Sequence, residues 1–233
     1  MRKYFYTIVF LMVLFVGCVD SKKVHEVVDP VREDIEWLNL WFPHTNDEEL
    51  PRVLLIGNSI TNAYYPEVST LLEGKAYVSK LTTSKSIGDP ALLAEVSLAL
   101  SYEDFDIVHF NNGLHGWGYT EEEYQKSFPD LIETIKTHAP NARLIWATIS
   151  PMRVKQNIEE LDPKTERVRK RNEIALDIVE KEGIRVNDLF NLVIDHPEFY
   201  AGGDGIHLVP LGVSAMAKQV AGIIEDEINT GKK

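Results

Sequence analysis

The sequence predicts an α/β fold in three layers, with helices covering both faces of a central, mostly parallel sheet of five strands. Two observations indicate this fold. After Pro51, short apolar stretches alternate with amphipathic stretches of helical length, as in a series of strand-helix units. The first of these stretches, 53–56, is apolar at every position, which is typical of a parallel strand buried on both faces.

The expected elements follow one another without a repeat and without a second domain. Strands are expected at 52–56, 76–81, 107–110, 144–149 and 184–186. Helices are expected at 90–100, from Thr120, from Asp162-Pro163 and from Pro210. The helix from Thr120 opens with a capping box that ends at Glu123, and Pro129 should kink or break it. Together these elements define one domain at 51–230.

The segment 30–50, ahead of this domain, is expected to contain a helix. Asp29-Pro30 offers an N-cap followed by a proline in the first turn. Apolar side chains then recur at helical spacing: Val31, Ile35, Leu38 and Phe42. The helix should therefore dock on the main domain. Trp37 and Trp41 lie beside this stripe, where they could either join the core or meet a substrate.

The first residues are typical of a secretory signal. Arg2-Lys3 precede an apolar run at 4–16, which is shorter than the roughly 20 residues that cross a bilayer. Cys18, the only cysteine, stands where cleavage would occur, so the segment resembles the lipobox of bacterial lipoproteins, although Phe15 is bulkier than the usual leucine. We expect a signal peptide at 1–17, a tether at 18–29 and an exported protein anchored to a membrane by lipid on Cys18.

Charge excludes one class of partner. Removal of residues 1–17 takes away two positive charges, so the net charge of −12 becomes −14. An acidic surface repels phosphate backbones, which makes nucleic acid an unsuitable partner. With Cys18 consumed, no disulfide can form, and the core must stabilise the fold by itself.

Several chemically active residue types follow the expected strand ends. Ser59 comes after the first strand, the segment 111–115 after the third and Pro151 after the fourth. In parallel sheets of this kind, ligands bind beyond the carboxyl ends of the strands. We therefore expect one site at this edge of the sheet.

A serine, an aspartate and a histidine offer the parts of a hydrolytic triad. Ser59 lies in Gly57-Asn58-Ser59, and Asp204 and His207 form an Asp-x-x-His pair near the C-terminus. A serine hydroxyl needs a base, and a histidine needs a partner that fixes its tautomer and stabilises its cation. The Gly-x-Ser-x-Gly elbow of α/β-hydrolases is absent, because Thr61 replaces the second glycine.

These blocks resemble the SGNH (GDSL-type) hydrolases over residues 52 to 212. Gly57-Asn58-Ser59 matches the family's Gly-Asp-Ser with Asn in place of Asp, and Asp204 to His207 matches its Asp-x-x-His in full. Gly88 fits the family's isolated glycine after the second strand. The resemblance implies a flavodoxin-like sheet, Ser59, Asp204 and His207 as catalytic residues, and oxyanion donors in the backbone N–H groups of Ser59 and Gly88.

The block after the third strand departs from the family pattern Gly-x-Asn-Asp. Aligning the glycines places Gly113 on the family glycine and His115 on the asparagine that completes the oxyanion hole. Alternatively, Asn111, two residues before Gly113, supplies that donor. The sequence leaves both choices open.

The resemblance implies a serine esterase that needs no cofactor. Its substrate is expected to be a small acyl ester, above all acetyl groups on a carbohydrate. A lysophospholipase or another acyl hydrolase is one alternative, and a non-catalytic glycan-binding lipoprotein of the same fold is another.

Other residues are weaker candidates for a binding or catalytic role. His109 and His115 lack nearby carboxylates at ligand spacing, so no metal site is expected. Asp188 reads as a helix cap and Arg153 as a solvated side chain that could also hold a substrate. Trp117 and Tyr119 could stack on a sugar or pack a loop.

Overall fold

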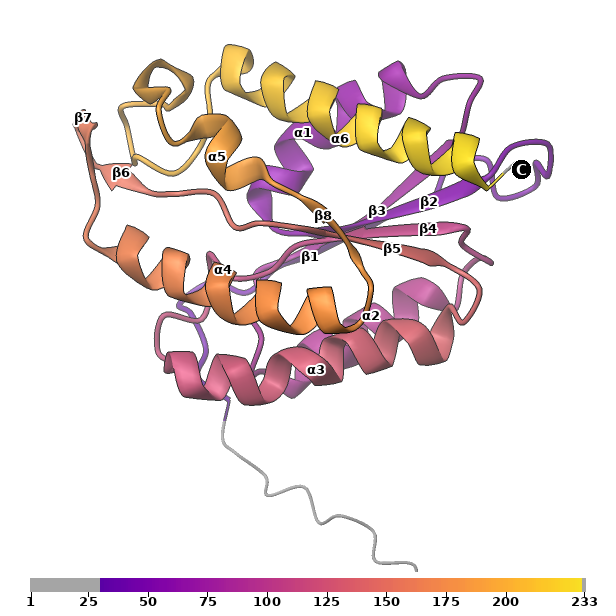
Figure 1. Ribbon diagram of the computed structural model, residues 1–233, viewed down its shortest axis with the longest axis horizontal. Helices are drawn as coiled ribbons and strands as arrows, with labels where there is room; N and C mark the ends of the chain where they lie inside the picture. The colour runs from indigo at the N-terminus through magenta and orange to yellow at the C-terminus, as the bar shows by residue number, and fades with distance from the viewer. Residues whose placement is uncertain (1–29, 232–233) are drawn as a thin grey trace, which may run out of the picture.

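The computed structural model describes residues 30–231, and its centre is a six-stranded sheet (Figure 1). The strand order is β1-β3-β2-β4-β5-β8. The bounds of these strands are, along the chain, Leu38–Trp41, Arg52–Gly57, Tyr77–Thr83, Ile107–Phe110, Arg143–Ala147 and Arg185–Asn187. All pair in parallel except β1, which runs antiparallel to β3. The five parallel strands are those expected.

Helices cover both faces of the sheet, which confirms the three-layer fold. One face carries α1 (Ser59–Leu71), α5 (Leu189–Val193) and α6 (Pro210–Thr230). The other carries α2 (Pro90–Leu100), α3 (Glu121–His138) and α4 (Lys164–Lys181), as Figure 1 shows. A hairpin of β6 (Arg153–Val154) and β7 (Asn157–Leu161) and the 3₁₀ turn η1 (Pro197–Phe199) extend beyond the carboxyl end of β5.

The apolar run of β2 forms the centre of the core. Val53, Leu54 and Leu55 are fully buried because α1 and α6 cover one face of the strand and α2 and α3 the other. Burial of these side chains fixes the register of β2, so Gly57 and the residue after it emerge at the carboxyl edge of the sheet.

The segment 30–50 is a correction to the sequence prediction. Its only regular element is β1, and it contains no helix. The helical spacing of its apolar residues does not produce a buried face, since Val31 and Ile35 are 46% and 75% exposed. The edge of β3 instead offers unpaired backbone groups, and pairing Leu38 with Thr83 and Leu40 with Leu81 satisfies them. The segment does pack on the main domain, as a sixth strand.

Pro129 does not break α3, which continues through it to His138. The proline is exposed, so water can reach the backbone around the missing hydrogen bond. The capping box at Thr120 and Glu123 is present in both directions. The expected signal peptide, tether and Cys18 lie outside the described residues. Within residues 30–231, no helix is long and apolar enough to cross a membrane.

Candidate active site

Ser59 is the first residue of α1, directly after β2. The side-chain oxygen of Asn58 caps the helix by accepting a hydrogen bond from the N–H of Ile60 at 3.0 Å. A Cβ on Gly57 would lie 2.0 Å from the hydroxyl oxygen of Thr61, so only glycine fits before this turn. The three residues thus place the serine at the positive end of a helix, at the edge where ligands bind.

The structure brings Ser59, His207 and Asp204 together in one hydrogen-bonded chain. The Ser59 hydroxyl oxygen lies 2.9 Å from Nε2 of His207. Nδ1 of the same ring lies 2.6 Å from a carboxylate oxygen of Asp204. Because the carboxylate can only accept, Nδ1 carries the hydrogen and Nε2 is left to receive the proton of the serine. This is the order of groups that activates a serine.

Asp204 is held as an anion by its own loop. Burial alone would raise the pKa of Asp204, but hydrogen bonds from the His207 side chain and from the backbone N–H groups of Ile206 and His207 lower it. Gly205 has a φ of +72°, and a Cβ there would strike the carbonyl of Arg153. The Asp204-Gly205 turn therefore stabilises the Asp204 carboxylate and also packs the loop against β6.

Gly88 lies in a second loop, between β3 and α2. Its φ is +105°, and a Cβ on it would come within 2.8 Å of the Tyr119 ring. Asn112 holds this loop from the other side, because its amide oxygen accepts from the N–H of Ile87 at 3.0 Å and its nitrogen donates to the carbonyl of Lys85 at 2.8 Å. The backbone beside Gly88 is thus fixed from two directions.

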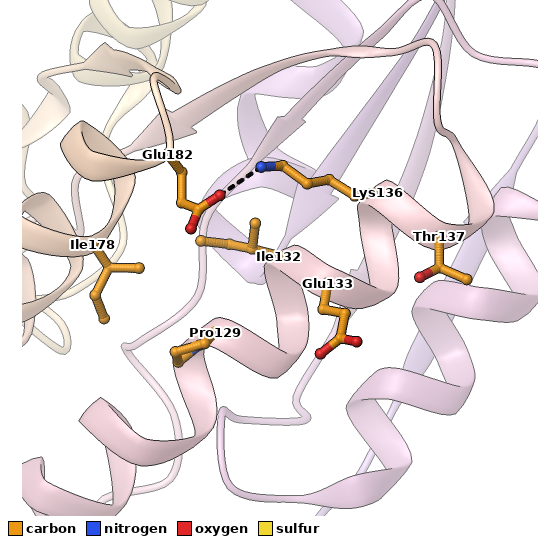
Figure 2. Close-up of a pocket in the computed structure, with 7 residues that line it drawn as sticks. All are labelled: Pro129, Ile132, Glu133, Lys136, Thr137, Ile178 and Glu182. Atoms are coloured by element: carbon orange, nitrogen blue, oxygen red, sulfur yellow. Dashed lines mark hydrogen bonds and ion pairs between the residues drawn. The ribbon is translucent and has the colours of Figure 1, made fainter.

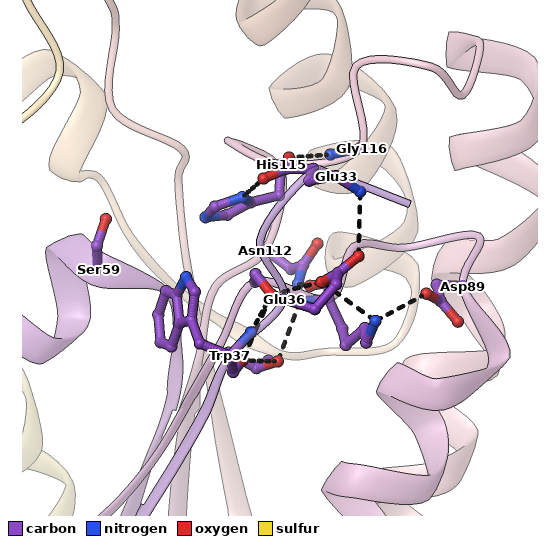
Figure 3. A network of polar contacts seen from close by, with 12 residues as sticks. Glu33, Glu36, Trp37, Ser59, Asp89, Asn112, His115 and Gly116 are labelled. Carbon is purple, nitrogen blue, oxygen red and sulfur yellow. Dashed lines mark hydrogen bonds and ion pairs between the residues drawn. The ribbon is translucent and has the colours of Figure 1, made fainter. Parts of the chain in front are cut away.

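Asn111 and His115 point to different parts of the molecule. The amide nitrogen of Asn111 donates to the carbonyl of Ala147 at 2.7 Å, toward β5. Nδ1 of His115 lies 2.9 Å from the carboxylate of Glu33, from the segment before β1. In Figure 3 the His115 ring extends toward the side on which Ser59 lies. Gly113 packs so closely on Ile149 that a Cβ would lie 2.2 Å from it.

Arg171 of α4 organises this block and was missed in the sequence. It is 1% exposed, and its guanidinium donates to the carbonyls of Gly113, His115, Gly116 and Tyr119 at 2.9 to 3.2 Å. Its Nε also lies 3.3 Å from the Glu121 carboxylate. The signal was present, since Arg171 falls on the inward stripe between Val168 and Ala175, where an apolar residue is the rule.

The weaker candidates take structural positions. Asp188 caps α5 by accepting from the N–H of Asn191, as expected. Arg153 is buried rather than solvated, and its guanidinium donates to the carbonyl of Ile158 at 2.8 Å. The correction follows from the hairpin that the sequence did not predict. Trp117 lies under Arg167 and Arg171, so it packs a loop.

His109 is a core residue. It is fully buried in β4, and the Asn187 amide nitrogen lies 3.0 Å from its Nε2. Burial lowers the pKa of His109 to about 4. Within residues 30–231, no group of three or more His, Cys, Asp and Glu side chains could hold a metal ion.

A hollow of about 390 Å³ lies far from the triad (Figure 2). It is lined by the C-terminal halves of α3 and α4, including Pro129, Ile132 and Ile178. The ion pair between Lys136 and Glu182, at 2.7 Å, lies across it. The triad stands at the carboxyl edge of the sheet, near the opposite ends of these helices, so the hollow does not belong to the site.

Comparisons with known proteins agree with this fold. No protein-family model matches the chain, and no curated protein matches it. A GDSL-like lipase from Bacteroides thetaiotaomicron superposes with a TM-score of 0.61 and 15% identity, over 75% of this chain and 88% of that one. A lipase/acylhydrolase from Enterococcus faecalis gives 0.61 and 16%, over 76% and 96%.

A third structure adds a carbohydrate enzyme to these lipases. A carbohydrate esterase of family 3 from Talaromyces cellulolyticus superposes with a TM-score of 0.61 and 16% identity, over 77% of this chain and 99% of that one. At such identities the likeness shows the fold. The chain therefore has the α/β fold of the GDSL-like lipases and acylhydrolases, as its sequence blocks implied.

Proposed function

We propose that this protein is a carboxylic ester hydrolase that uses Ser59, His207 and Asp204 as a catalytic triad. The observation that carries the proposal is the continuous chain from the Ser59 hydroxyl through His207 to Asp204, at 2.9 and 2.6 Å. A turn serine and a loop histidine with only structural roles would have no reason to meet across 148 residues of chain. The shared fold of acylhydrolases supports the same reading.

The geometry assigns each residue a step. The Ser59 oxygen attacks the ester carbonyl carbon while its proton passes to Nε2 of His207. The same nitrogen then returns the proton to the leaving alcohol, and an acyl-enzyme remains. Water repeats the sequence and releases the acid. Asp204 keeps the ring in the tautomer with hydrogen on Nδ1 and balances the charge of the imidazolium.

The developing oxyanion would be received by the backbone N–H groups of Ser59 and Gly88. For the third donor we propose the imidazolium form of His115 rather than Asn111. Because the Glu33 carboxylate can only accept, the hydrogen on Nδ1 of His115 faces Glu33, and the ring needs its second hydrogen, on Nε2, to donate to the oxyanion. The Asn111 amide is turned toward Ala147, away from β2, whereas Glu33 holds His115 from the other side. An oxyanion donor of this kind contributes about 10²–10³ in rate.

The proposed substrate is a small acyl ester, in first place an acetyl group on a carbohydrate. Two observations support it. The Asp204 and His207 side chains are 44% and 49% exposed, so a bulky alcohol can reach them. One protein of this fold is a carbohydrate esterase. The sequence also favours export as a lipoprotein anchored through Cys18.

Labelling by a fluorophosphonate tests the catalytic proposal. The wild-type protein should be labelled on Ser59, and Ser59→Ala should be neither labelled nor active on nitrophenyl acetate. Release of acetate from acetylated xylan and from sialic acid esters, against release of fatty acid from lysophospholipid, then separates the carbohydrate esterase from the lipid enzyme. Failure of the folded wild-type protein to label would identify it as a binding module.

The anchor has its own test. In a bacterial host, labelled palmitate should enter the protein, and globomycin should cause the precursor to accumulate. Cys18→Ser should abolish both effects while leaving the purified domain active. Absence of label together with an unchanged precursor would leave a simple exported protein.

A further inference from the structure

The segment 30–41, called the arm below, lies at the active site although it is outside the four motif blocks. Its residue Trp37 directly precedes β1, and His115 lies in the loop after β4. In the sheet, β3 and β2 separate these two strands. Yet the two rings meet edge to face, with centroids 6.2 Å apart. The rings therefore reach across the ends of β3 and β2, which is where Ser59 stands (Figure 3).

The register of the sheet gives the same placement. Leu38 pairs with Thr83, and Thr82 pairs with Gly57, so Trp37 and Ser59 lie nearly level, two strands apart. Two strand spacings amount to about 10 Å between backbones. An indole covers much of that distance. Trp37 is half-buried and lies outside the hydrophobic core, in contrast to Trp146.

A polar network fixes the arm in this position. The N–H of Trp37 donates to the Ser84 hydroxyl at 2.9 Å, and the N–H of Ser84 donates to the Trp37 carbonyl at 3.1 Å. The Glu36 carboxylate accepts from the Ser84 hydroxyl at 2.5 Å and lies 3.1 Å from the Lys85 ammonium, whose side chain is only 7% exposed. These contacts join residues 36 and 37 of the arm to residues 84 and 85, directly after β3.

A second anchor joins the arm to the loop after β4. The Glu33 carboxylate takes a hydrogen bond from the N–H of Gly116 at 3.3 Å and meets His115 at 2.9 Å. The Tyr119 hydroxyl accepts from the N–H of Val31 at 2.9 Å. Glu33 is thus a positioning residue that acts through His115, and the arm and the donor loops form one wall.

This wall stands on the side of Ser59 away from the general acid. His207 comes from the loop that docks on β6, beyond β5, because the N–H of Arg153 donates to the carbonyl of Gly205 at 2.8 Å. Trp37 comes from the opposite flank, beside β3. The leaving alcohol must lie next to His207 to receive its proton, so the acyl group is directed away from His207 and toward Trp37.

We infer that Trp37 closes the acyl side of the active site and restricts the enzyme to short acyl groups. The inference rests on the proposed esterase function and adds the residue that sets the acyl length. The indole fills the space that a longer chain would need, while an acetyl group requires little room beyond the ester carbon. Selection between short and long acyl groups is then steric, and it is made by the arm rather than by the motif blocks.

The test compares Trp37→Ala and Trp37→Phe with wild type on nitrophenyl acetate, butyrate and octanoate. Trp41→Ala is the matched control, because Trp41 is the last residue of the strand that Trp37 precedes, is 58% exposed and pairs with Lys80 at the far end of β1. In Trp37→Ala the ratio of kcat/KM for acetate to that for octanoate should fall by about tenfold or more. The same ratio for Trp37→Phe should lie between those of Trp37→Ala and wild type, and the ratio for Trp41→Ala should equal that of wild type.

Three outcomes would overturn the inference. The first is an unchanged acetate-to-octanoate ratio in both Trp37 variants. The second is an equal loss on all three esters, which would make Trp37 structural. The third is a raised KM for an acetylated xylo-oligosaccharide with the acyl ratio unchanged, which would make the indole a sugar platform. A wild-type protein that hydrolyses none of the esters refutes the proposed function itself, which is a separate result.

Discussion

The two flanks of Ser59 are built in opposite ways. On one side, the loop 201–209 carries Asp204 and His207, both about half exposed and bonded to each other within four residues. On the other side, the loops 84–89 and 111–119 are largely buried and held by side chains from distant elements, among them Arg171. A base can therefore be positioned by a short local turn, whereas the oxyanion side depends on the whole fold.

The difference has a physical basis. The base and its carboxylate need only each other, and an Asp-x-x-His turn supplies that pair by chain connectivity. A backbone N–H donor keeps its direction only if the loop that carries it is fixed. Such a loop is fixed by other side chains that form hydrogen bonds with its buried backbone groups. Asn112 and Arg171 do this from the interior. Substitutions on the two flanks should consequently differ in whether they affect chemistry alone or also stability.

The largest effect is expected on the local flank. Asp204→Asn should lower kcat by about 10⁴, because the amide neither favours hydrogen on Nδ1 nor balances the imidazolium. The free energy of unfolding should change little, since the side chain is 44% exposed. Steady-state kinetics and urea unfolding measure the two quantities. Glu198→Gln, which removes an exposed carboxylate beside His196, is the control. A loss below tenfold would contradict the triad.

The next largest effect is expected on the buried flank, and it should appear in stability. Arg171→Met leaves several buried carbonyls without a donor and Glu121 without this partner, so the free energy of unfolding should fall by about 3–5 kcal/mol. Lys170→Met, at a 61% exposed neighbour on α4, should be nearly neutral. Urea unfolding measures both. A change of under 1 kcal/mol in Arg171→Met would show that the loops hold themselves.

A smaller effect separates His115, the proposed third oxyanion donor, from its alternative Asn111. His115→Ala should lower kcat by about 10²–10³ with little change in KM. Asn111→Ala should instead lose stability by about 1–3 kcal/mol, because it removes the hydrogen bond to Ala147, while kcat falls less than in His115→Ala. Kinetics on nitrophenyl acetate measure the change in kcat for the two variants, and thermal melting measures the change in stability. The reverse pattern, with full turnover in His115→Ala, would assign the donor to Asn111.

The same contrast explains what the sequence could predict. The apolar run of β2, the capping box at Thr120 and the Asp204 turn are local patterns, and the structure confirms the elements they predict. The order of the elements placed Ser59 at the carboxyl edge of the sheet. The meeting of Ser59 with His207 was expected from the resemblance of their sequence blocks to the SGNH hydrolases.

The other features could not be predicted from the sequence, because they depend on residues that are far away in the chain. The apolar residues of the arm follow helical spacing, yet the free edge of β3 draws residues 38–41 into a strand. A lone arginine at an inward helical position carries no hint of which carbonyls it will meet. Trp37 was ambiguous for the same reason, since its role depends on a ring from the loop after β4.

The smallest effect concerns a histidine that belongs to neither flank. The Gln219 amide nitrogen donates to the Asn187 oxygen at 2.8 Å, so the Asn187 nitrogen faces His109 and donates to its Nε2. With burial lowering the pKa of His109 to about 4, the unfolded chain binds a proton there first as the pH falls from about 6.5. The stability that the neutral ring contributes is complete above that pH and is lost progressively toward pH 4.

His109→Gln keeps an acceptor for Asn187 and removes the titration. Between pH 7 and pH 4.5 the free energy of unfolding of the wild-type protein should fall by about 2–3 kcal/mol more than that of His109→Gln. Urea unfolding at several pH values measures the two slopes. Equal slopes would mean that His109 takes up its proton in the folded protein, which its complete burial in β4 opposes.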